Sequence, residues 1–183
     1  MKTHQPGRFM SSFIFWTIKL MHDNPLLAIF KDPYEHLNAA GLKPGQRVLE
    51  VGCGPGFFTI PAAKIVGDKG FVYAVDVNHL AIEHIGEKIK EGKIKNVKPI
   101  CSNASNTGLP DGSIDVSFIF GTLHFAGGVG DVIYEMSRIL KPDGILSFEK
   151  TRDSEEELIN KIEGEGFTYS GSDGRILLFK KVE

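Results

Sequence analysis

Short apolar runs alternate with longer amphipathic stretches along most of the chain. Five of these runs are rich in β-branched and aliphatic residues and are bounded by turn residues, which is typical of buried strands. They are RVLEV (47–51), FVYAVDV (71–77), VKPIC (97–101), IDVSFIF (114–120) and ILSFE (145–149). Because amphipathic stretches separate the strands, the pattern predicts a parallel sheet with helical crossovers.

The stretches between the strands carry apolar residues at helical spacing. One helix is predicted from Asn78, which can serve as its N-cap, to about Glu91. A Lys-Pro-Asp-Gly turn at 141–144 is expected to close the helix that precedes the fifth strand. The other predicted helices cover 57–66, 132–140 and about 154–163.

The last part of the chain departs from this alternation. The runs FTYSG (167–171) and RILLFKK (175–181) are joined by Ser172, Asp173 and Gly174, which predicts an antiparallel hairpin. The predicted fold class is therefore α/β: a Rossmann-like, doubly wound, mostly parallel seven-stranded sheet that ends in an antiparallel hairpin, with helices on both faces. In such a sheet, ligands bind at the carboxyl ends of the strands.

The N-terminus carries a separate apolar segment, FMSSFIFWTIKLM (9–21). It lacks the cleavage site of a signal peptide, Lys19 interrupts it, and it is shorter than the roughly 20 residues that span a bilayer. We interpret residues 1–40 as an N-terminal helical segment and candidate lid, and 41–183 as the main domain. The alternative is a helix that lies on a membrane surface.

Composition narrows the class of protein. A chain of 183 residues with 42% hydrophobic types fits one domain with an ordinary core. The formal net charge of -2 does not indicate a nucleic-acid partner, although four lysines between 88 and 95 form a local basic run. We interpret that run as a solvated helix face, with a partner-binding patch as the alternative. The two cysteines form no C-x-x-C pair, which favours a cytoplasmic protein without disulfides.

The most informative stretch is VLEVGCGPGFF (48–58), which follows the first strand. A dinucleotide-binding loop has the spacing G-x-G-x-x-G and places a pyrophosphate at a helix N-terminus. Here Phe57 stands where the third glycine of that motif belongs, and Glu50 would bring a carboxylate toward phosphates, where like charges about 4 Å apart repel by roughly 1 to 4 kcal/mol. A cofactor with positive charge and no phosphate fits better, and S-adenosylmethionine has both a sulfonium and an ammonium group.

The segment LEVGCGPG resembles the first motif of class I S-adenosylmethionine-dependent methyltransferases, and VDVN resembles the acidic end of their second strand. The resemblance covers about 42–150 and is nearest to the small-molecule branch that includes the ubiquinone and menaquinone methyltransferases. It implies S-adenosylmethionine as cofactor, S-adenosylhomocysteine as product and a small-molecule methyl acceptor. The residues that it implies for cofactor binding are Glu50, Gly52, Cys53, Gly54, Gly56, Asp76, Val77, Asn103, Ala104 and Phe120.

These residues have different implied roles. Glu50 would support the ammonium end, Asp76 would accept hydrogen bonds from both ribose hydroxyls, and Val77 would contact the adenine. Asn103 stands where the family usually has an acidic adenine contact, which weakens that contact without removing it. Cys53 is interpreted as a small loop residue rather than a nucleophile.

The acceptor side is less defined. His124, just after the fourth strand, stands where related small-molecule enzymes often carry a histidine, and we assign it a general-base or acceptor-orienting role, with a structural histidine as the alternative. The histidines lack metal-ligand spacing, so no metal site is predicted. Two other functions are left open: a noncatalytic S-adenosylmethionine-binding module that acts through a partner, and a nicotinamide-dependent oxidoreductase on the same scaffold.

Overall fold

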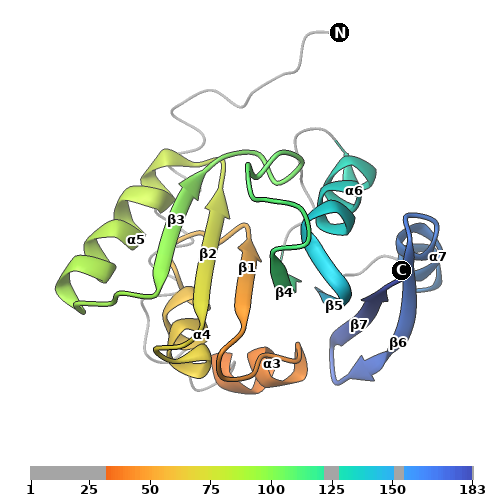
Figure 1. Cartoon of the computed structure of the whole chain (residues 1–183), viewed down its shortest axis with the longest axis horizontal. Helices are drawn as coiled ribbons and strands as arrows, with labels where there is room; N and C mark the ends of the chain where they lie inside the picture. Colours follow the sequence, from red (N-terminus) through yellow and green to blue (C-terminus); the bar gives the residue numbers. More distant parts are fainter. Residues whose placement is uncertain (1–31, 122–127, 151–154, 183) are drawn as a thin grey trace, which may run out of the picture.

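The computed structural model describes residues 32–121, 128–150 and 155–182, which form a seven-stranded sheet with flanking helices (Figure 1). The strand order is β3-β2-β1-β4-β5-β7-β6. The strands are β1 (Arg47–Val51), β2 (Phe71–Asp76), β3 (Val97–Cys101), β4 (Ile114–Ile119), β5 (Leu140–Glu149), β6 (Phe167–Asp173) and β7 (Ile176–Lys181). The helices are α3 (Pro33–Ala39), α4 (Thr59–Val66), α5 (His79–Glu91), α6 (Val129–Ile139) and α7 (Glu155–Glu163).

Strands β1 to β5 run parallel, and β7 joins them antiparallel to β5 and β6. The order reverses between β1 and β4, so the chain crosses from one half of the sheet to the other at this point. Such a switch point opens a crevice at the carboxyl ends of the strands. The predicted fold class, including the closing hairpin, is confirmed.

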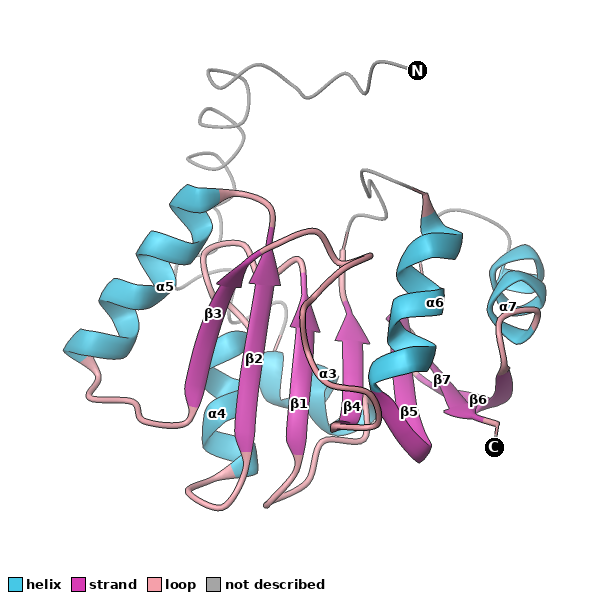
Figure 2. Ribbon diagram, turned by 45° about the horizontal axis from the view of Figure 1, so that its top comes forward, coloured by secondary structure: helices cyan, strands magenta, loops and turns pink. Residues whose placement is uncertain are grey.

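Helices cover both faces of the sheet, as Figure 2 shows, with α3 and α4 behind it and α6 in front. Alternate strand residues enter two hydrophobic clusters, because successive strand side chains point to opposite faces. Val48 and Phe118 pack with α3 and α4, whereas Leu49 and Ile119 pack with α6. Burial on both faces explains why these strands read as continuous apolar runs.

Most predicted element positions agree with the structure. Asn78 caps α5 by accepting a hydrogen bond from the Leu80 N–H at 3.0 Å. The strand β5, however, begins at Leu140 rather than at Ile145, because Leu140 already pairs with Ile114 before the chain bulges. In the hairpin, Asp173 belongs to β6, so the turn consists of the next two residues rather than of 172–174.

Several sequence predictions fall outside the described residues. The apolar segment 9–21 lies there, as does nearly all of the predicted N-terminal segment, of which only α3 and its flanks are described. Leu37 of α3 is fully buried in the domain core. Across the described ranges, no helix combines the length and hydropathy needed to cross a bilayer.

Candidate functional site

The glycine-rich loop after β1 is tied to the end of β2 by its backbone. The N–H groups of Gly52 and Cys53 both donate to the Val75 carbonyl, at 2.8 and 3.1 Å. Gly52, Gly54 and Gly56 have φ values of 74°, 49° and 84°, a region that residues with a Cβ rarely adopt. A Cβ at Gly52 or Gly54 would meet no atom within 4 Å, so the loop leaves open space for a ligand to approach the backbone.

Gly56 is required for a second reason, since a Cβ there would lie 3.1 Å from Cγ1 of Ile85 on α5. We expect Gly56→Ala to destabilise the fold by more than the roughly 1–2 kcal/mol that a left-handed residue costs. Gly45→Ala is the matched control, because Gly45 has a φ of 86° and a Cβ there would meet nothing within 4 Å. Urea unfolding of both variants measures the difference, and equal losses of stability would contradict the proposed crowding.

Glu50 lies under this loop with only 3% of its surface exposed. The Thr59 hydroxyl, from the first turn of α4, donates a hydrogen bond to its Oε2. Burial raises the pKa of Glu50 from 4.5 to about 8, helped by the nearby Asp76 and opposed by the Thr59 hydrogen bond. A buried carboxyl that ionises so reluctantly favours a cationic ligand, because the cation would offset the cost of the buried negative charge.

Asp76 ends β2 beside the same loop. Its Oδ2 accepts a hydrogen bond from the Gly54 N–H at 2.9 Å and its Oδ1 accepts one from the Asn78 N–H at 2.8 Å. Burial raises the pKa of Asp76, although these backbone hydrogen bonds oppose the shift. Each carboxylate oxygen retains a further acceptor position for a ligand hydroxyl. Next to it, the side chain of Val77 is 65% exposed and is therefore open to contact with a ligand.

Cys53 is buried within the loop, with 4% of its surface exposed. Burial raises the pKa of its thiol, and the nearby Glu50 and Asp76 carboxyl groups add to the shift. A thiol held in its neutral form is a poor nucleophile, because the thiolate is the reactive species. The geometry therefore supports the interpretation of Cys53 as a small loop residue.

The segment after β3 forms a tight turn beside Asp76, whose carbonyl accepts from the Ser102 N–H at 3.1 Å. The Asn103 side-chain oxygen accepts a hydrogen bond from the Ser105 N–H at 3.1 Å, so one of its lone pairs organises the turn. Ala104 is 5% exposed and belongs to the core.

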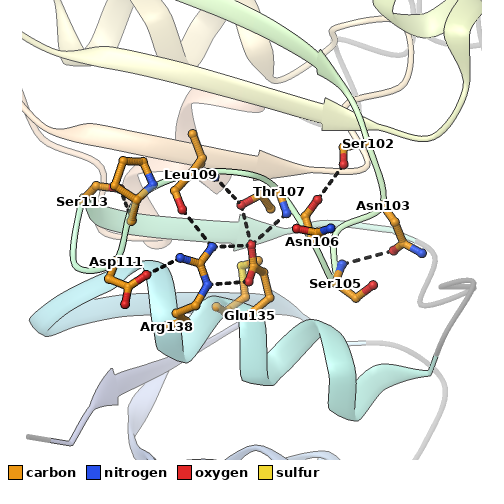
Figure 3. A network of polar contacts seen from close by, with 12 residues as sticks. Ser102, Asn103, Ser105, Asn106, Thr107, Leu109, Asp111, Ser113, Glu135 and Arg138 are labelled. Carbon is orange, nitrogen blue, oxygen red and sulfur yellow. Dashed lines mark hydrogen bonds and ion pairs between the residues drawn. The ribbon is translucent and has the colours of Figure 1, made fainter.

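A buried polar network holds this segment against α6 (Figure 3). Oε1 of Glu135 accepts hydrogen bonds from both the N–H and the hydroxyl of Thr107, at 2.8 and 2.7 Å. Arg138 donates to both carboxylate oxygens of Glu135 at 2.8 Å, to the Leu109 carbonyl and to Asp111. The apolar stripe of α6 does not reveal this network, because its partners come from a loop.

We expect Glu135→Ala to destabilise the protein by about 1 to 3 kcal/mol, because it leaves the buried Thr107 N–H without its acceptor and removes one of the partners of Arg138. Burial alone would raise the pKa of Glu135, but the hydrogen bonds from Arg138 and Thr107 outweigh it and lower the pKa. The stabilisation by ionised Glu135 is therefore fully present above the pKa that Glu135 has in the unfolded chain. It is lost as the pH falls through the lower pKa that Glu135 has in the folded protein. Unfolding of wild-type and Glu135→Ala protein between pH 7 and 3 tests this, and a constant difference would contradict it.

Phe120, predicted to contact the cofactor, directly follows the last residue of β4. Its ring packs on Phe58 and Phe118, with centroids 5.0 and 4.9 Å apart. His36 of α3 and Glu149 at the end of β5 lie beside this aromatic group. Sequence reasoning did not select either residue. His124 lies outside the described residues.

The structure thus brings the predicted residues of β1, β2, β3 and β4 together at one edge of the sheet. A family model described as a methyltransferase domain matches residues 42–178. The chain belongs to the methyltransferase domain family. The family predicted from the sequence is confirmed, as is the Rossmann-like fold. Among the described residues, no group of three or more histidine, cysteine or acidic side chains could hold a metal ion.

Known methyltransferases resemble the chain over most of this domain. The chain is 34% identical over 118 residues to the ubiquinone/menaquinone biosynthesis C-methyltransferase UbiE of Vibrio campbellii. The aligned region covers 62% of this chain and 46% of that protein. The chain is 35% identical over 103 residues to a demethylmenaquinone methyltransferase of Geobacillus sp., covering 56% and 44%. The chain therefore spans less than half the length of these curated relatives.

A solved structure matches nearly the whole chain. The crystal structure of a SAM dependent methyltransferase from Aquifex aeolicus has a TM-score of 0.80 and 28% sequence identity, covering 92% of this chain and 98% of that one. The similarity therefore includes the closing hairpin as well as the strands that carry the loop.

Proposed function

We propose that this chain is an S-adenosylmethionine-dependent methyltransferase that acts on a small-molecule acceptor. The observation that carries the proposal is the buried Glu50 carboxyl under a glycine loop whose Gly54 N–H is bound to Asp76. A nicotinamide dinucleotide would bring its pyrophosphate toward these carboxyl groups, which disfavours the oxidoreductase alternative. A sulfonium and an ammonium group would instead be attracted to them.

The residues present fit this cofactor. Asp76 would accept the two ribose hydroxyls through its remaining lone pairs, and exposed Val77 would lie against the adenine. The ionised carboxylate of Glu50 would support the ammonium group of the cofactor. The turn at Asn103 and Ala104 would border the adenine from the other side, and the left-handed glycines would allow the backbone to approach the methionine part. When bound, S-adenosylmethionine supplies a methyl group already activated by its sulfonium.

For the protein itself, the remaining task is to position an acceptor and to exclude water, which can contribute about 7 to 11 kcal/mol in favourable cases. The partly exposed ring of Phe120, backed by the buried rings of Phe58 and Phe118, would form an apolar surface for an aromatic acceptor. The names of the relatives, which are enzymes of ubiquinone and menaquinone biosynthesis, support a hydroquinone ring as the acceptor class. His124 is proposed to orient the acceptor, and residues 1–40 are proposed to cover the bound acceptor.

We place the reaction in the cytoplasm and expect no nucleic-acid partner. Both cysteines, Cys53 and Cys101, are free thiols in the structure, which fits a reducing compartment. The net charge of -2 offers no general attraction to phosphate backbones. Contact of the N-terminal segment with a membrane surface is the less favoured alternative.

A transfer assay tests the proposal. The purified chain is incubated with S-adenosylmethionine carrying an isotopically labelled methyl group and with a panel that contains 1,4-naphthohydroquinone, catechol and an aliphatic alcohol. We expect labelled product from the aromatic hydroxyl compounds and equimolar S-adenosylhomocysteine. Retained cofactor binding without transfer to any acceptor would favour the noncatalytic binding module.

A further inference from the structure

A histidine and a glutamate from distant parts of the sequence meet at the acceptor side of the site. Nε2 of His36 on α3 lies 3.9 Å from Oε1 of Glu149, the last residue of β5. The two side chains are 20% and 11% exposed, so both are largely covered and neither is sealed from a ligand.

Strand alternation places this pair on the same face of the sheet as Glu50. Ile145 and Phe120 pack in the cluster that faces α3 and α4. Glu149 is separated from Ile145 by an even number of positions along β5, so its side chain points to the same face of the sheet. The imidazole of His36 lies beside two aromatic rings, with centroids 6.0 Å from Phe58 and 6.3 Å from Phe120. A continuous row of side chains therefore leads from the proposed ammonium site to His36.

The hydrogen bonding of His36 defines which of its nitrogens can act as a base. Nδ1 lies 3.1 Å from the backbone carbonyl of Asp32, and because a carbonyl oxygen only accepts, Nδ1 must carry the hydrogen. In the neutral ring, Nε2 then presents a lone pair. Its 3.9 Å separation from Oε1 of Glu149 is longer than a hydrogen bond, and a hydroxyl group could bridge the two atoms.

Charged groups face the His36 ring from another part of the sheet. Glu149 faces it from β5, and Nε of Arg175, from the β6–β7 turn, lies 4.0 Å from the same Glu149 oxygen. Glu35, on the same helix, is exposed, and among the described residues Glu149 is the carboxylate that lies within 4 Å of Nε2. A carboxylate next to a histidine orients the ring and stabilises the imidazolium that forms when the ring accepts a proton.

We propose that His36 is the base that removes the proton from a hydroxyl group on an aromatic acceptor, with Glu149 as its positioning residue. This inference rests on the proposed methyltransferase function. In the step, the acceptor O–H bond breaks, an N–H bond forms at Nε2, and the electron pair remains on the acceptor oxygen. The imidazolium afterwards returns the proton to solvent, so that no oxidant or reductant is needed.

The chemistry of the base selects the acceptor class. A phenol such as that of tyrosine ionises near pH 10, within a few units of imidazole, whereas water ionises only near 15.7 and alkyl alcohols resemble it. An imidazole can therefore generate a useful amount of phenolate but very little alkoxide. The neighbouring Phe58 and Phe120 rings offer edges and faces to an aromatic ring.

The test uses 4-nitrophenol, whose absorption spectrum changes on ionisation, as a probe bound to the full chain saturated with S-adenosylhomocysteine at pH 6. We expect a bound, ionised probe in the wild-type protein and a loss of about tenfold or more of the ionised fraction in His36→Gln. Glu149→Gln should reduce the fraction less. Glu83→Gln is the matched control, since Glu83 pairs with His79 on the exposed surface of α5 and should leave the spectrum unchanged.

A second measurement follows the pH profile of transfer to 1,4-naphthohydroquinone. We expect His36→Gln to lower kcat by about 100-fold, in the range typical of a general base, and to abolish the fall in rate on the acidic side. An unchanged ionised fraction in His36→Gln, or a loss that appears only in His124→Gln, would overturn the assignment. Failure of the wild-type protein to bind S-adenosylhomocysteine would instead contradict the proposed function itself.

Discussion

Substitution of Asp76 by alanine is expected to weaken S-adenosylmethionine binding by about two to four orders of magnitude. The change removes two hydrogen bonds to a charged acceptor, each contributing about 1.5 to 3 kcal/mol. It also removes the acceptor of the Gly54 and Asn78 N–H groups, which donate hydrogen bonds to the Asp76 carboxylate at N···O distances of 2.9 and 2.8 Å in the wild-type protein. The glycine loop therefore loses its side-chain tie to the end of β2 at the same time as the ligand loses its acceptor, while the backbone hydrogen bonds to Val75 remain.

Asp76→Asn separates these two contributions. An asparagine retains one side-chain oxygen for the backbone donors but cannot accept on both sides, so we expect intermediate binding. Isothermal titration with S-adenosylhomocysteine, together with circular dichroism to verify the fold, measures the series. An Asp76→Ala protein that is folded and binds with the wild-type Kd would show that the ribose lies elsewhere.

Glu50→Gln is expected to have opposite effects on stability and on binding. The glutamine can still accept the Thr59 hydroxyl hydrogen bond, but it never places a negative charge in the core. The cofactor-free variant should therefore be more stable than the wild type near pH 8. Its affinity for S-adenosylmethionine should fall by about 10- to 100-fold, as expected when a charge-assisted hydrogen bond is lost.

The pH dependence follows from the raised pKa of Glu50, which burial moves from 4.5 to about 8. Between these values the folded protein holds a proton that the unfolded chain has released, so stability falls as the pH rises across this window. Below about pH 4.5 both states are protonated and the contribution is fully present. Cofactor affinity should change in the opposite direction, rising by up to about tenfold per pH unit, because the ionised carboxylate is the form that pairs with ammonium.

Thermal and urea unfolding between pH 5 and 8 measure the fall in stability with rising pH. Titration calorimetry over the same range measures the rise in cofactor affinity. The ionisation of the ligand is common to both proteins, so the difference between wild type and Glu50→Gln isolates this residue. Parallel pH profiles of the two proteins would contradict the assignment of the buried proton to Glu50.

The strand pattern could be predicted because both faces of the parallel strands are buried, so each strand stands out as an apolar run between turns. The start of β5 could not be predicted, because no loop separates this strand from α6. Leu140 continues the apolar stripe of the helix and at the same time pairs with Ile114 of β4. The bounds of the short helix α3, within the predicted helical segment 1–40, were not predicted, although Asp32 as N-cap and Pro33 at its first position were readable signals.

The grouping of the candidate cofactor-binding residues could be predicted for a similar reason. Glu50, the glycines and Asp76 all lie within a few residues of strand ends whose spacing is fixed by one βαβ unit. The acceptor side depends on contacts between distant segments. His36 and Glu149 meet only because α3 packs across β4 and β5, and Glu135 reaches Thr107 only because α6 lies over the loop after β3. No local pattern encodes such contacts.

The most direct measurement is an isothermal titration of the wild-type chain with S-adenosylmethionine, S-adenosylhomocysteine and NAD at pH 8, near the raised pKa of Glu50. We predict binding of both sulfur compounds at a single site, with release of a proton from Glu50, and no binding of NAD. Binding of NAD, or no binding of either sulfur compound by the folded protein, would contradict the proposal.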